Sequence, residues 1–282
     1  MGDVSFSENL NSINFSGPIE FPGLGITVDP SVTFFGTSVH WYGVLIAIGL
    51  TLAVIVGIYL GKKYGVSSDI IFDAVIFGAP AGIIGARLYY VIFSWDYYKD
   101  HLSEIFMIWN GGLAIYGGII LAVIVGLIYC RVRKISPLKL MDLGGIGFPI
   151  GQAVGRWGNF VNREAFGGPA GDNVLLRMKL YTEDMQTWAQ VHPTFLYESL
   201  WNMCTVVFLI WLIKRRKFDG QVFWTYVLTY GIGRFWIEGL RTDSLYIGTF
   251  RVSQLLALLT AVVAIVIIVY NLKKVKKPQT EE

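Results

Sequence analysis

The chain has 282 residues, of which 54% are hydrophobic and only 15% are charged, and its formal net charge at pH 7 is +3. This composition excludes an ordinary soluble globule, because several apolar runs reach the roughly 20 residues that a membrane-spanning helix needs. The small net charge does not favour nucleic-acid binding. The two cysteines, Cys130 and Cys204, show neither zinc-ligand spacing nor a disulfide framework, so we expect two buried thiols.

Seven apolar segments follow one another along the chain, and we expect each of them to form a transmembrane helix. They cover residues 41–61, 69–93, 112–130, 137–154, 195–213, 220–240 and 252–272. The fourth segment is the least convincing span, because it contains Asp142, Pro149 and four glycines, and we expect a kink or a break in it. The predicted fold class is therefore an all-α integral membrane protein, built as a bundle of seven transmembrane helices.

Basic residues are distributed unevenly between the two sides of such a bundle. Fourteen lie in clusters on one side, seven lie on the other, and Arg87 and Arg234 fall inside segments. Clustered basic residues remain in the cytoplasm, so we expect the N-terminus outside and the C-terminus inside. The first 40 residues contain no Lys or Arg and therefore do not resemble a cleavable signal peptide. The expected organisation is an extracytoplasmic segment 1–40, a transmembrane domain 41–272 with an extracytoplasmic loop 155–194, and a basic, mobile cytoplasmic tail 273–282.

The stretch 155–164, which continues through Gly167-Gly168-Pro169 and is called the signature stretch below, carries the most unusual set of side chains. It combines arginines, asparagines, a glutamate and glycines directly after an apolar segment. An arginine at the centre of a membrane helix costs about 2.5–3.5 kcal/mol, so Arg156 needs a partner or a task. Guanidinium and amide groups, with glycines that let the backbone turn closely, suit an anionic ligand and above all phosphate. The alternative is a cap and turn that only ties two helices together.

Other polar residues fall on the same side of the predicted bundle as the signature stretch. They are Tyr42, Arg87, Tyr90, Tyr116, His192, Tyr197, Glu198, Tyr230, Arg234, Glu238 and Arg241. The opposite side shows only ordinary basic loops. This asymmetry favours a site that faces the outer leaflet over a pore lined from end to end.

Several of these residues have two open interpretations. Tyr230, Arg234 and Glu238 recur every four residues and therefore share a helical face. Arg234 either forms a charge-neutral structural pair with Glu238 or joins the arginine of the signature stretch in holding a phosphate. His192 either belongs to the site or only caps the helix that follows Pro193. Tyr42 and Tyr116 either line the site or belong to the aromatic belt at the membrane surface.

Taken together, these motifs resemble the bacterial prolipoprotein diacylglyceryl transferases. The similarity covers essentially the whole membrane part, on the following stretches: Trp41-Tyr42-Gly43, Gly85-Ala86-Arg87-Leu88, Gly111-Gly112 to Gly117-Gly118, the signature stretch, His192 to Glu198, and Tyr230 to Glu238. The resemblance implies transfer of the sn-1,2-diacylglyceryl group from phosphatidylglycerol to the lipobox cysteine of a preprolipoprotein. A thioether forms and glycerol phosphate leaves. No metal and no cofactor are implied, and the place of action is the bacterial cytoplasmic membrane.

The resemblance also implies functional positions. Catalysis is expected to depend on Arg156, Arg234, Tyr116 and Glu238, and substrate binding on Arg156, Asn159, Glu164, Gly167, Tyr42, Arg87, Tyr230 and His192. At Tyr116 this sequence departs from the family pattern, because several members carry a histidine at that position. That histidine has been proposed as the base. A tyrosine with a reference pKa of about 10 is a poor proton acceptor at neutral pH unless it is ionised.

The expected chemistry asks two things of the site. Sulfur attacks the glycerol carbon that carries the phosphate, so the site must favour a thiolate and stabilise the charge that grows on the departing phosphate. Arg156 and Arg234 fit both tasks. Lipid and peptide both need lateral openings between helices, and the 165–191 insertion and the 1–40 segment are candidate covers. The rival interpretations are an outer-leaflet-facing phospholipid or anion transporter and a scaffold for partner helices.

Overall fold

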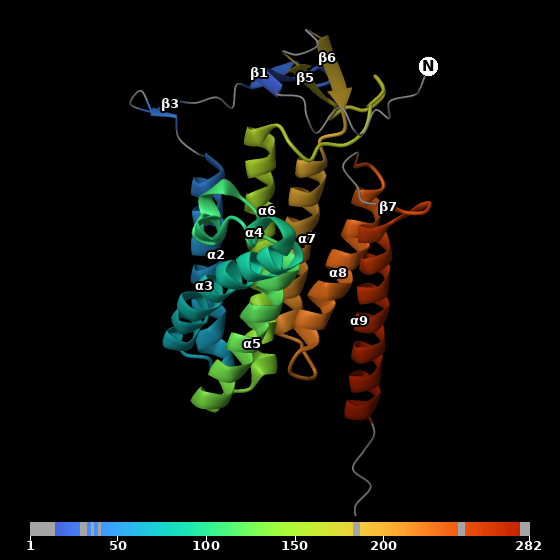
Figure 1. Cartoon of the computed structure of the whole chain (residues 1–282). Helices are drawn as coiled ribbons and strands as arrows, with labels where there is room; N and C mark the ends of the chain where they lie inside the picture. The colour runs from blue at the N-terminus through green and yellow to red at the C-terminus, as the bar shows by residue number, and fades with distance from the viewer. Residues whose placement is uncertain are drawn as a thin grey trace, which may run out of the picture. The chain divides into compact units, whose positions relative to one another are not determined.

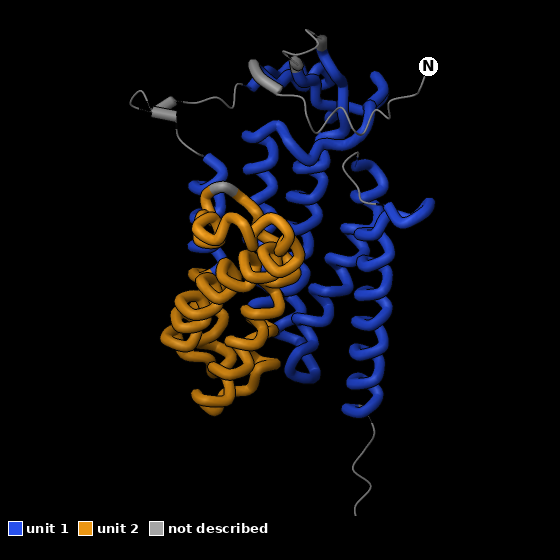
Figure 2. The backbone as a smooth tube through the Cα atoms, in the orientation of Figure 1, with its two compact units in different colours: residues 1–53, 144–282 blue, residues 54–143 orange. Residues whose placement is uncertain are grey.

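The computed structural model describes residues 15–28, 33–34, 37–38, 41–182, 187–241 and 246–276 (Figure 1). The chain forms two compact units (Figure 2). Unit 1 contains residues 1–53 and 144–282, and unit 2 contains residues 54–143.

Long helices form at every segment where the sequence predicts one. They are α2 (Trp41–Tyr64), α3 (Ser68–Phe93), α5 (Ile115–Arg133), α6 (Pro137–Asn162), α7 (Thr194–Ile213), α8 (Gln221–Glu238) and α9 (Val252–Lys276). Among the described helices, α2, α3, α5, α7 and α9 are long and apolar enough to cross a membrane. Only 11% to 33% of the most apolar part of each is buried within the protein, which leaves broad apolar faces for lipid. The chain is therefore a mostly helical, multi-pass membrane protein.

Helix α6 differs from its prediction at two points. It continues past Pro149 without a break, which leaves a kink there as a prediction, and it ends at Asn162 rather than at residue 154, so the first half of the signature stretch is helical. Two of its glycines permit close packing. A β-carbon on Gly145 would lie 2.9 Å from the Cα of Phe223 in α8, and one on Gly158 would lie 2.5 Å from the ring of Tyr42.

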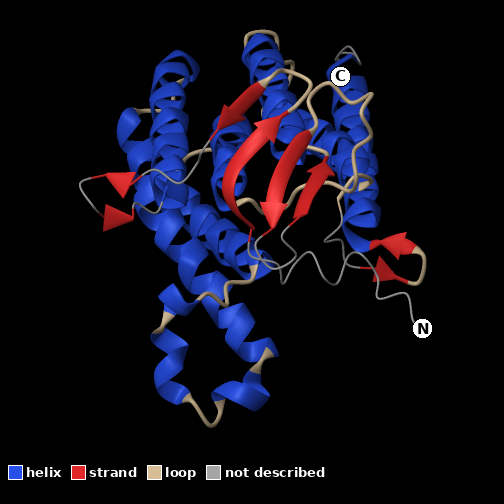
Figure 3. Ribbon diagram, turned by 90° about the horizontal axis from the view of Figure 1, so that it is seen from above, coloured by secondary structure: helices blue, strands red, loops and turns tan. Residues whose placement is uncertain are grey.

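Unit 1 also contains a small antiparallel sheet that the all-α prediction did not include (Figure 3). Its strands are β1 (Phe15–Phe21), β2 (Ile26–Val28), β5 (Met178–Thr182) and β6 (Thr187–Val191), in the order β2-β1-β5-β6. Leu180 lies opposite Ile19 on one side and Ala189 on the other. The buried face of the sheet packs on Phe160 near the end of α6 and Phe195 near the start of α7. The sheet thus covers the point where the signature stretch leaves its helix.

Two short hairpins complete unit 1. Strands β3 (Thr33–Phe34) and β4 (Thr37–Ser38) precede α2, and strands β7 (Tyr246–Ile247) and β8 (Phe250–Arg251) precede α9. Helix α9 extends through Lys276, so the first part of the predicted mobile tail is helical, and the rest lies outside the described residues.

In unit 2, α3 and α5 pack at very short range. A β-carbon on Gly85 would lie 2.4 Å from the carbonyl oxygen of Gly117, and one on Gly118 would lie 2.9 Å from that of Gly82. Small residues on α3 therefore permit close helix contact, as their clustering predicts. The connection that follows α3 contains α4 (Trp95–Tyr98) and the short 3-10 helices η1 (Leu102–Phe106) and η2 (Ile108–Asn110).

The cysteines differ from the expectation of two buried thiols. Both are free, but only Cys130 is buried, and Cys204 lies exposed on α7.

Candidate active site

A buried carboxylate, that of Glu198, lies at the centre of the polar cluster in unit 1. Glu198 is in the second turn of α7, and only 7% of its side chain is exposed. Its Oε2 lies 2.5 Å from Nε of Arg156, which projects from α6. Its Oε1 lies 3.2 Å from a terminal nitrogen of Arg234, in α8, and 3.7 Å from one of Arg241. Three guanidinium groups, one from α6 and two from α8 and the residues just after it, therefore lie around one carboxylate.

Glu238 supplies the second carboxylate of this cluster. It lies one helical turn after Arg234 on α8, and its Oε2 is 2.5 Å from Nη2 of that arginine. The side chain of Glu238 is 2% exposed and that of Arg234 is 17% exposed. The cluster thus joins three arginines and two glutamates in a poorly solvated place. Several guanidinium groups held together in this way favour the binding of an anion.

A hydrogen-bond relay orients the arginine of the signature stretch. Asn159 donates from Nδ2 to Oε1 of Glu164, at 2.9 Å, so its Oδ1 is left to accept a hydrogen bond from Nη1 of Arg156, at 3.2 Å. Asn162 donates to the same Glu164 oxygen, at 3.2 Å. Glu164 thus folds back over the last turn of α6. Asn159 and Glu164 act on the cluster through Arg156 rather than from inside the pocket described below.

The backbone turns sharply just after α6, but not at the glycines. Arg163 and Ala165 adopt left-handed conformations, with φ of 55° and 56°, a region that residues with a β-carbon occupy at an energetic cost. The hydroxyl of Thr194 donates a 2.5 Å hydrogen bond to the carbonyl of Ala165 and holds this turn against the start of α7.

Gly167 joins the end of the signature stretch to the end of α8. Its N–H donates to the carbonyl of His192, and the residue forms an isolated β-bridge with Arg241. A β-carbon on Gly167 would lie 2.7 Å from the β-carbon of His192 and 3.0 Å from the carbonyl oxygen of Leu240. Only glycine fits here without a shift of the backbone that carries Arg241 into the cluster.

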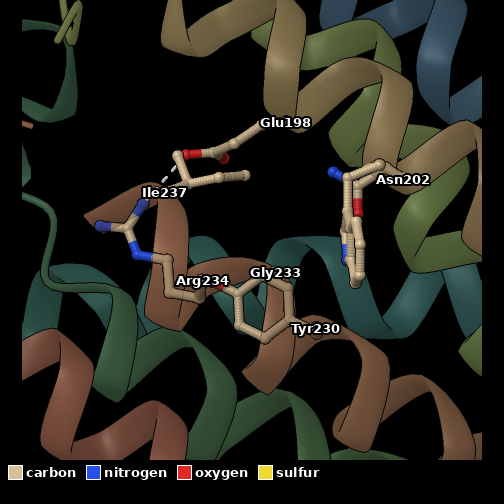
Figure 4. A pocket seen from close by; sticks show the side chains of 7 residues that line it. Glu198, Asn202, Tyr230, Gly233, Arg234 and Ile237 are labelled. Carbon is tan, nitrogen blue, oxygen red and sulfur yellow. Dashed lines mark hydrogen bonds and ion pairs between the residues drawn. The ribbon is translucent and has the colours of Figure 1, made fainter. Parts of the chain in front are cut away.

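A small pocket opens beside the ion pairs of the cluster (Figure 4). It is lined by Glu198, Trp201, Asn202, Tyr230, Gly233, Arg234 and Ile237. Its volume is about 10 Å³, which is close to the minimum for one water molecule. A lipid headgroup does not fit into it without movement of the side chains or helices around it.

The remaining predicted residues of unit 1 lie around the cluster at different distances from its ions. Tyr230 lines the pocket, one turn before Arg234. The ring of Tyr42 packs against the backbone of Gly158, in the signature stretch. His192 has its Nδ1 3.4 Å from the hydroxyl of Tyr197, and its backbone pairs with the segment after the turn. These contacts suit the helix-start role of His192 that the sequence left open.

Arg87 and Tyr116 belong to unit 2. The buried guanidinium of Arg87 donates four hydrogen bonds, of 2.5–3.0 Å, to the carbonyls of Glu104, Ile105, Gly111 and Gly112. It also lies over the ring of Tyr98, at 5.1 Å. These partners favour a role in holding the connection after α3, and substrate binding by Arg87 stays a prediction. Tyr116 lies in the first turn of α5 and is 50% exposed.

Sequence reasoning missed the central residue of this arrangement. The sequence groups Glu198 with the other polar residues of the site but predicts no role for it, although an acidic residue in an apolar helix start is itself a signal for a cationic partner. Asn202, one turn later, was not noticed at all. Within the described ranges, no group of three or more His, Cys, Asp or Glu residues is placed to hold a metal.

Comparison with known proteins identifies the family. The family model described as "Prolipoprotein diacylglyceryl transferase" matches residues 30–270. A "Phosphatidylglycerol--prolipoprotein diacylglyceryl transferase" of Clostridioides difficile strain 630 is 42% identical over 89% of this chain and 98% of that protein. A protein of the same name from Finegoldia magna is 43% identical over 87% of this chain and 96% of that protein. Another, from Listeria monocytogenes serovar 1/2a, is 45% identical over 89% of this chain and 92% of that protein. The chain therefore belongs to the prolipoprotein diacylglyceryl transferase family.

Proposed function

We propose that this membrane enzyme transfers the sn-1,2-diacylglyceryl group of phosphatidylglycerol to the lipobox cysteine thiol of a preprolipoprotein. The relatives whose names state this activity match the chain over most of its length and support the assignment. They give no support to the transporter interpretation. The observation that carries the proposal at the level of chemistry is the convergence of three guanidinium groups on one buried carboxylate.

The donor groups of the cluster suit the proposed substrate. A phosphodiester carries one negative charge, and the cluster brings three guanidinium groups together. Arginine presents paired N–H donors that suit two phosphate oxygens at once. We therefore place the phosphate between Arg156 and Arg234, where Glu198 stands in the present conformation. Binding then requires that the carboxylate of Glu198 give up at least one of these guanidinium groups.

The proposed reaction is a displacement at carbon. The cysteine sulfur attacks the sn-3 carbon of the diacylglyceryl group, and the bond from that carbon to the phosphate oxygen breaks. The electron pair of this bond leaves with glycerol phosphate, and the proton of the thiol passes to the departing phosphate or to water, so that charge is balanced. Arg156 and Arg234 stabilise the charge that grows on the leaving phosphate. Their positive charge also favours the thiolate form of the attacking cysteine.

Other residues take supporting parts in this scheme. Glu238 holds the guanidinium of Arg234 from the side away from Glu198, and Asn159 with Glu164 holds that of Arg156. Tyr116 belongs to unit 2, and its catalytic role stays a prediction from the sequence. The scheme uses no metal and no cofactor.

We also propose that all seven long helices cross the membrane. Helices α6 and α8 are less apolar than the other five, and each carries more than one charged residue, whereas α7 carries only Glu198. The excess of basic residues in the other connections then places the cluster toward the outer leaflet, the N-terminus outside and the C-terminus in the cytoplasm. A lipid substrate reaches such a site sideways from the bilayer.

The test is a direct assay of the product. The purified protein is incubated with phosphatidylglycerol vesicles and a synthetic lipobox peptide, and the peptide mass is measured. We expect a mass increase equal to a diacylglyceryl group in thioether linkage, and no increase for a peptide with serine in place of cysteine. Arg156→Ala is expected to abolish the product. Arg215→Ala is the matched control, because Arg215 packs on Trp211 and is not part of the cluster. Full product formation by Arg156→Ala would remove this arginine from the scheme.

A further inference from the structure

One buried polar side chain in the pocket has no role in the scheme above. Asn202 is 4% exposed and lies in the middle of the apolar helix α7. Its amide has no hydrogen-bond partner among the residues that the structure describes. Figure 4 shows Asn202 on the side of the pocket opposite Arg234. The amide atoms of Asn202 are not among the fully buried side-chain atoms that lack a partner, so the amide faces the pocket, where a bound group can accept its hydrogen bonds.

Tyr230 gives the pocket a second neutral group at the same level. It lines the pocket from α8, and its hydroxyl also has no hydrogen-bond partner in the described part of the chain. Asn202 follows Glu198 by four residues, and Tyr230 precedes Arg234 by four residues. One helical turn rises about 5–6 Å. The pocket therefore has a charged level, with Glu198 and Arg234, and a neutral level one turn nearer to the α7–α8 connection.

A glycerophospholipid has the same two levels. Its phosphate is attached to the sn-3 carbon, and the ester carbonyls at sn-1 and sn-2 lie a few ångströms further toward the hydrocarbon. These carbonyls accept hydrogen bonds and cannot donate them. The amide N–H₂ of Asn202 and the hydroxyl of Tyr230 are donors. The pocket has room for about one water molecule, which is comparable to the space that a single carbonyl oxygen needs.

We propose that Asn202, together with Tyr230, donates hydrogen bonds to an ester carbonyl of the diacylglyceryl group. This contact holds the sn-3 carbon at a fixed distance below the phosphate that the arginines bind. Asn202 is then a substrate-binding residue that distinguishes diacyl lipids from lipids without ester carbonyls. The inference rests on the proposed function, because it takes the diacylglyceryl lipid as the substrate.

The experiment compares two lipids and two proteins. Phosphatidylglycerol with ester-linked chains and its ether-linked analogue of equal chain length differ only in the two carbonyls, and both keep the bond that the reaction breaks. We expect the wild-type enzyme to have a kcat/KM roughly 5–10-fold higher for the ester lipid, as the loss of one hydrogen bond predicts. Asn202→Leu has nearly the same side-chain size. It is expected to lower the rate for the ester lipid to that for the ether lipid, and to change the rate for the ether lipid by less than about twofold.

Two further variants keep the test sharp if Asn202→Leu folds poorly. Tyr230→Phe removes a single oxygen and is expected to reduce only the preference for the ester lipid. Met203→Leu changes an exposed neighbour on the same helix and should leave both rates unchanged.

The contrary outcomes are distinct. Equal wild-type rates for the two lipids, or an equal loss on both lipids in Asn202→Leu, would overturn the inference while the transferase activity stands. The inference would also be wrong if Asn202→Leu changed the preference between phosphatidylglycerol and phosphatidylpropanol, because the side chain would then contact the headgroup. Absence of product from wild-type enzyme with the ester lipid would overturn the proposed function itself.

Discussion

Replacement of Arg234 distinguishes a structural ion pair from a phosphate ligand. Arg234 bridges Glu198 and Glu238, at 3.2 and 2.5 Å, and the side chain of Glu238 is 2% exposed. Arg234→Ala leaves Glu238 buried without its cation, which costs about 3–5 kcal/mol of stability. The same variant also removes a donor from the leaving phosphate, which should lower kcat by about 10²–10³-fold.

A double variant separates these two effects. Arg234→Leu combined with Glu238→Gln removes both charges of the buried pair, and neutral replacement of such a pair is often close to neutral for stability. We expect this variant to unfold at nearly the wild-type temperature but to keep the 10²–10³-fold loss of turnover. Glu238→Gln alone, which still accepts a hydrogen bond from Arg234, should lose less than about tenfold.

The assay uses both readouts on the same preparations. Thermal unfolding in detergent gives stability, and the mass of the lipidated peptide after incubation with phosphatidylglycerol gives turnover. Near-wild-type turnover by the stable double variant would refute the reasoning, because Arg234 would then serve only to neutralise Glu238.

Three further predictions follow from other contacts. Gly167→Ala should reduce turnover at least tenfold with an intact fold, because the added β-carbon displaces the backbone segment that carries Arg241. The thermal unfolding temperature of this variant is the control for its fold. Arg87→Met should speed proteolysis of the connection after α3, because four backbone carbonyls lose their donor; unchanged cleavage would show that the connection is held by other contacts. Tyr116→Phe should lower kcat at least tenfold with little change in KM if the hydroxyl contacts the reacting thiol, and full activity would leave the ring a packing role.

The helices were predictable because long apolar runs have few alternatives in a membrane. The end of α6 was not, since Gly158 and the asparagines of the signature stretch suggest a loop when read alone. In the structure, Gly158 admits the ring of Tyr42, and Phe160 packs into the core under the sheet, so tertiary contacts keep this stretch helical.

The four-stranded sheet was not predictable from the sequence, for a different reason. Lys179 forms an ion pair with Glu20, a partner 159 residues away in the sequence. No local pattern specifies such a pairing, and the strands are short. The pairing of these strands therefore depends on tertiary contacts, namely on the apolar surface that the ends of α6 and α7 present to the sheet.

The site was partly predictable. The order of the apolar segments predicts Arg156 and Arg234 on the same side of the membrane. In the structure, both form ion pairs with Glu198. The identity of the shared carboxylate depends on how α6, α7 and α8 pack, which the sequence alone does not specify. Arg87 carried the same sequence signal as the other arginines, but its partners are carbonyl groups of its own unit.

The central claim is that two guanidinium groups hold the lipid phosphate while sulfur displaces it. The most direct measurement is a structure of the enzyme with a phosphonate analogue of phosphatidylglycerol, in which the scissile oxygen is replaced by carbon. We predict phosphonate oxygens within about 3 Å of Arg156 and Arg234, with the carboxylate of Glu198 moved away from at least one of them. A headgroup bound elsewhere, with both arginines still paired to Glu198, would contradict the account.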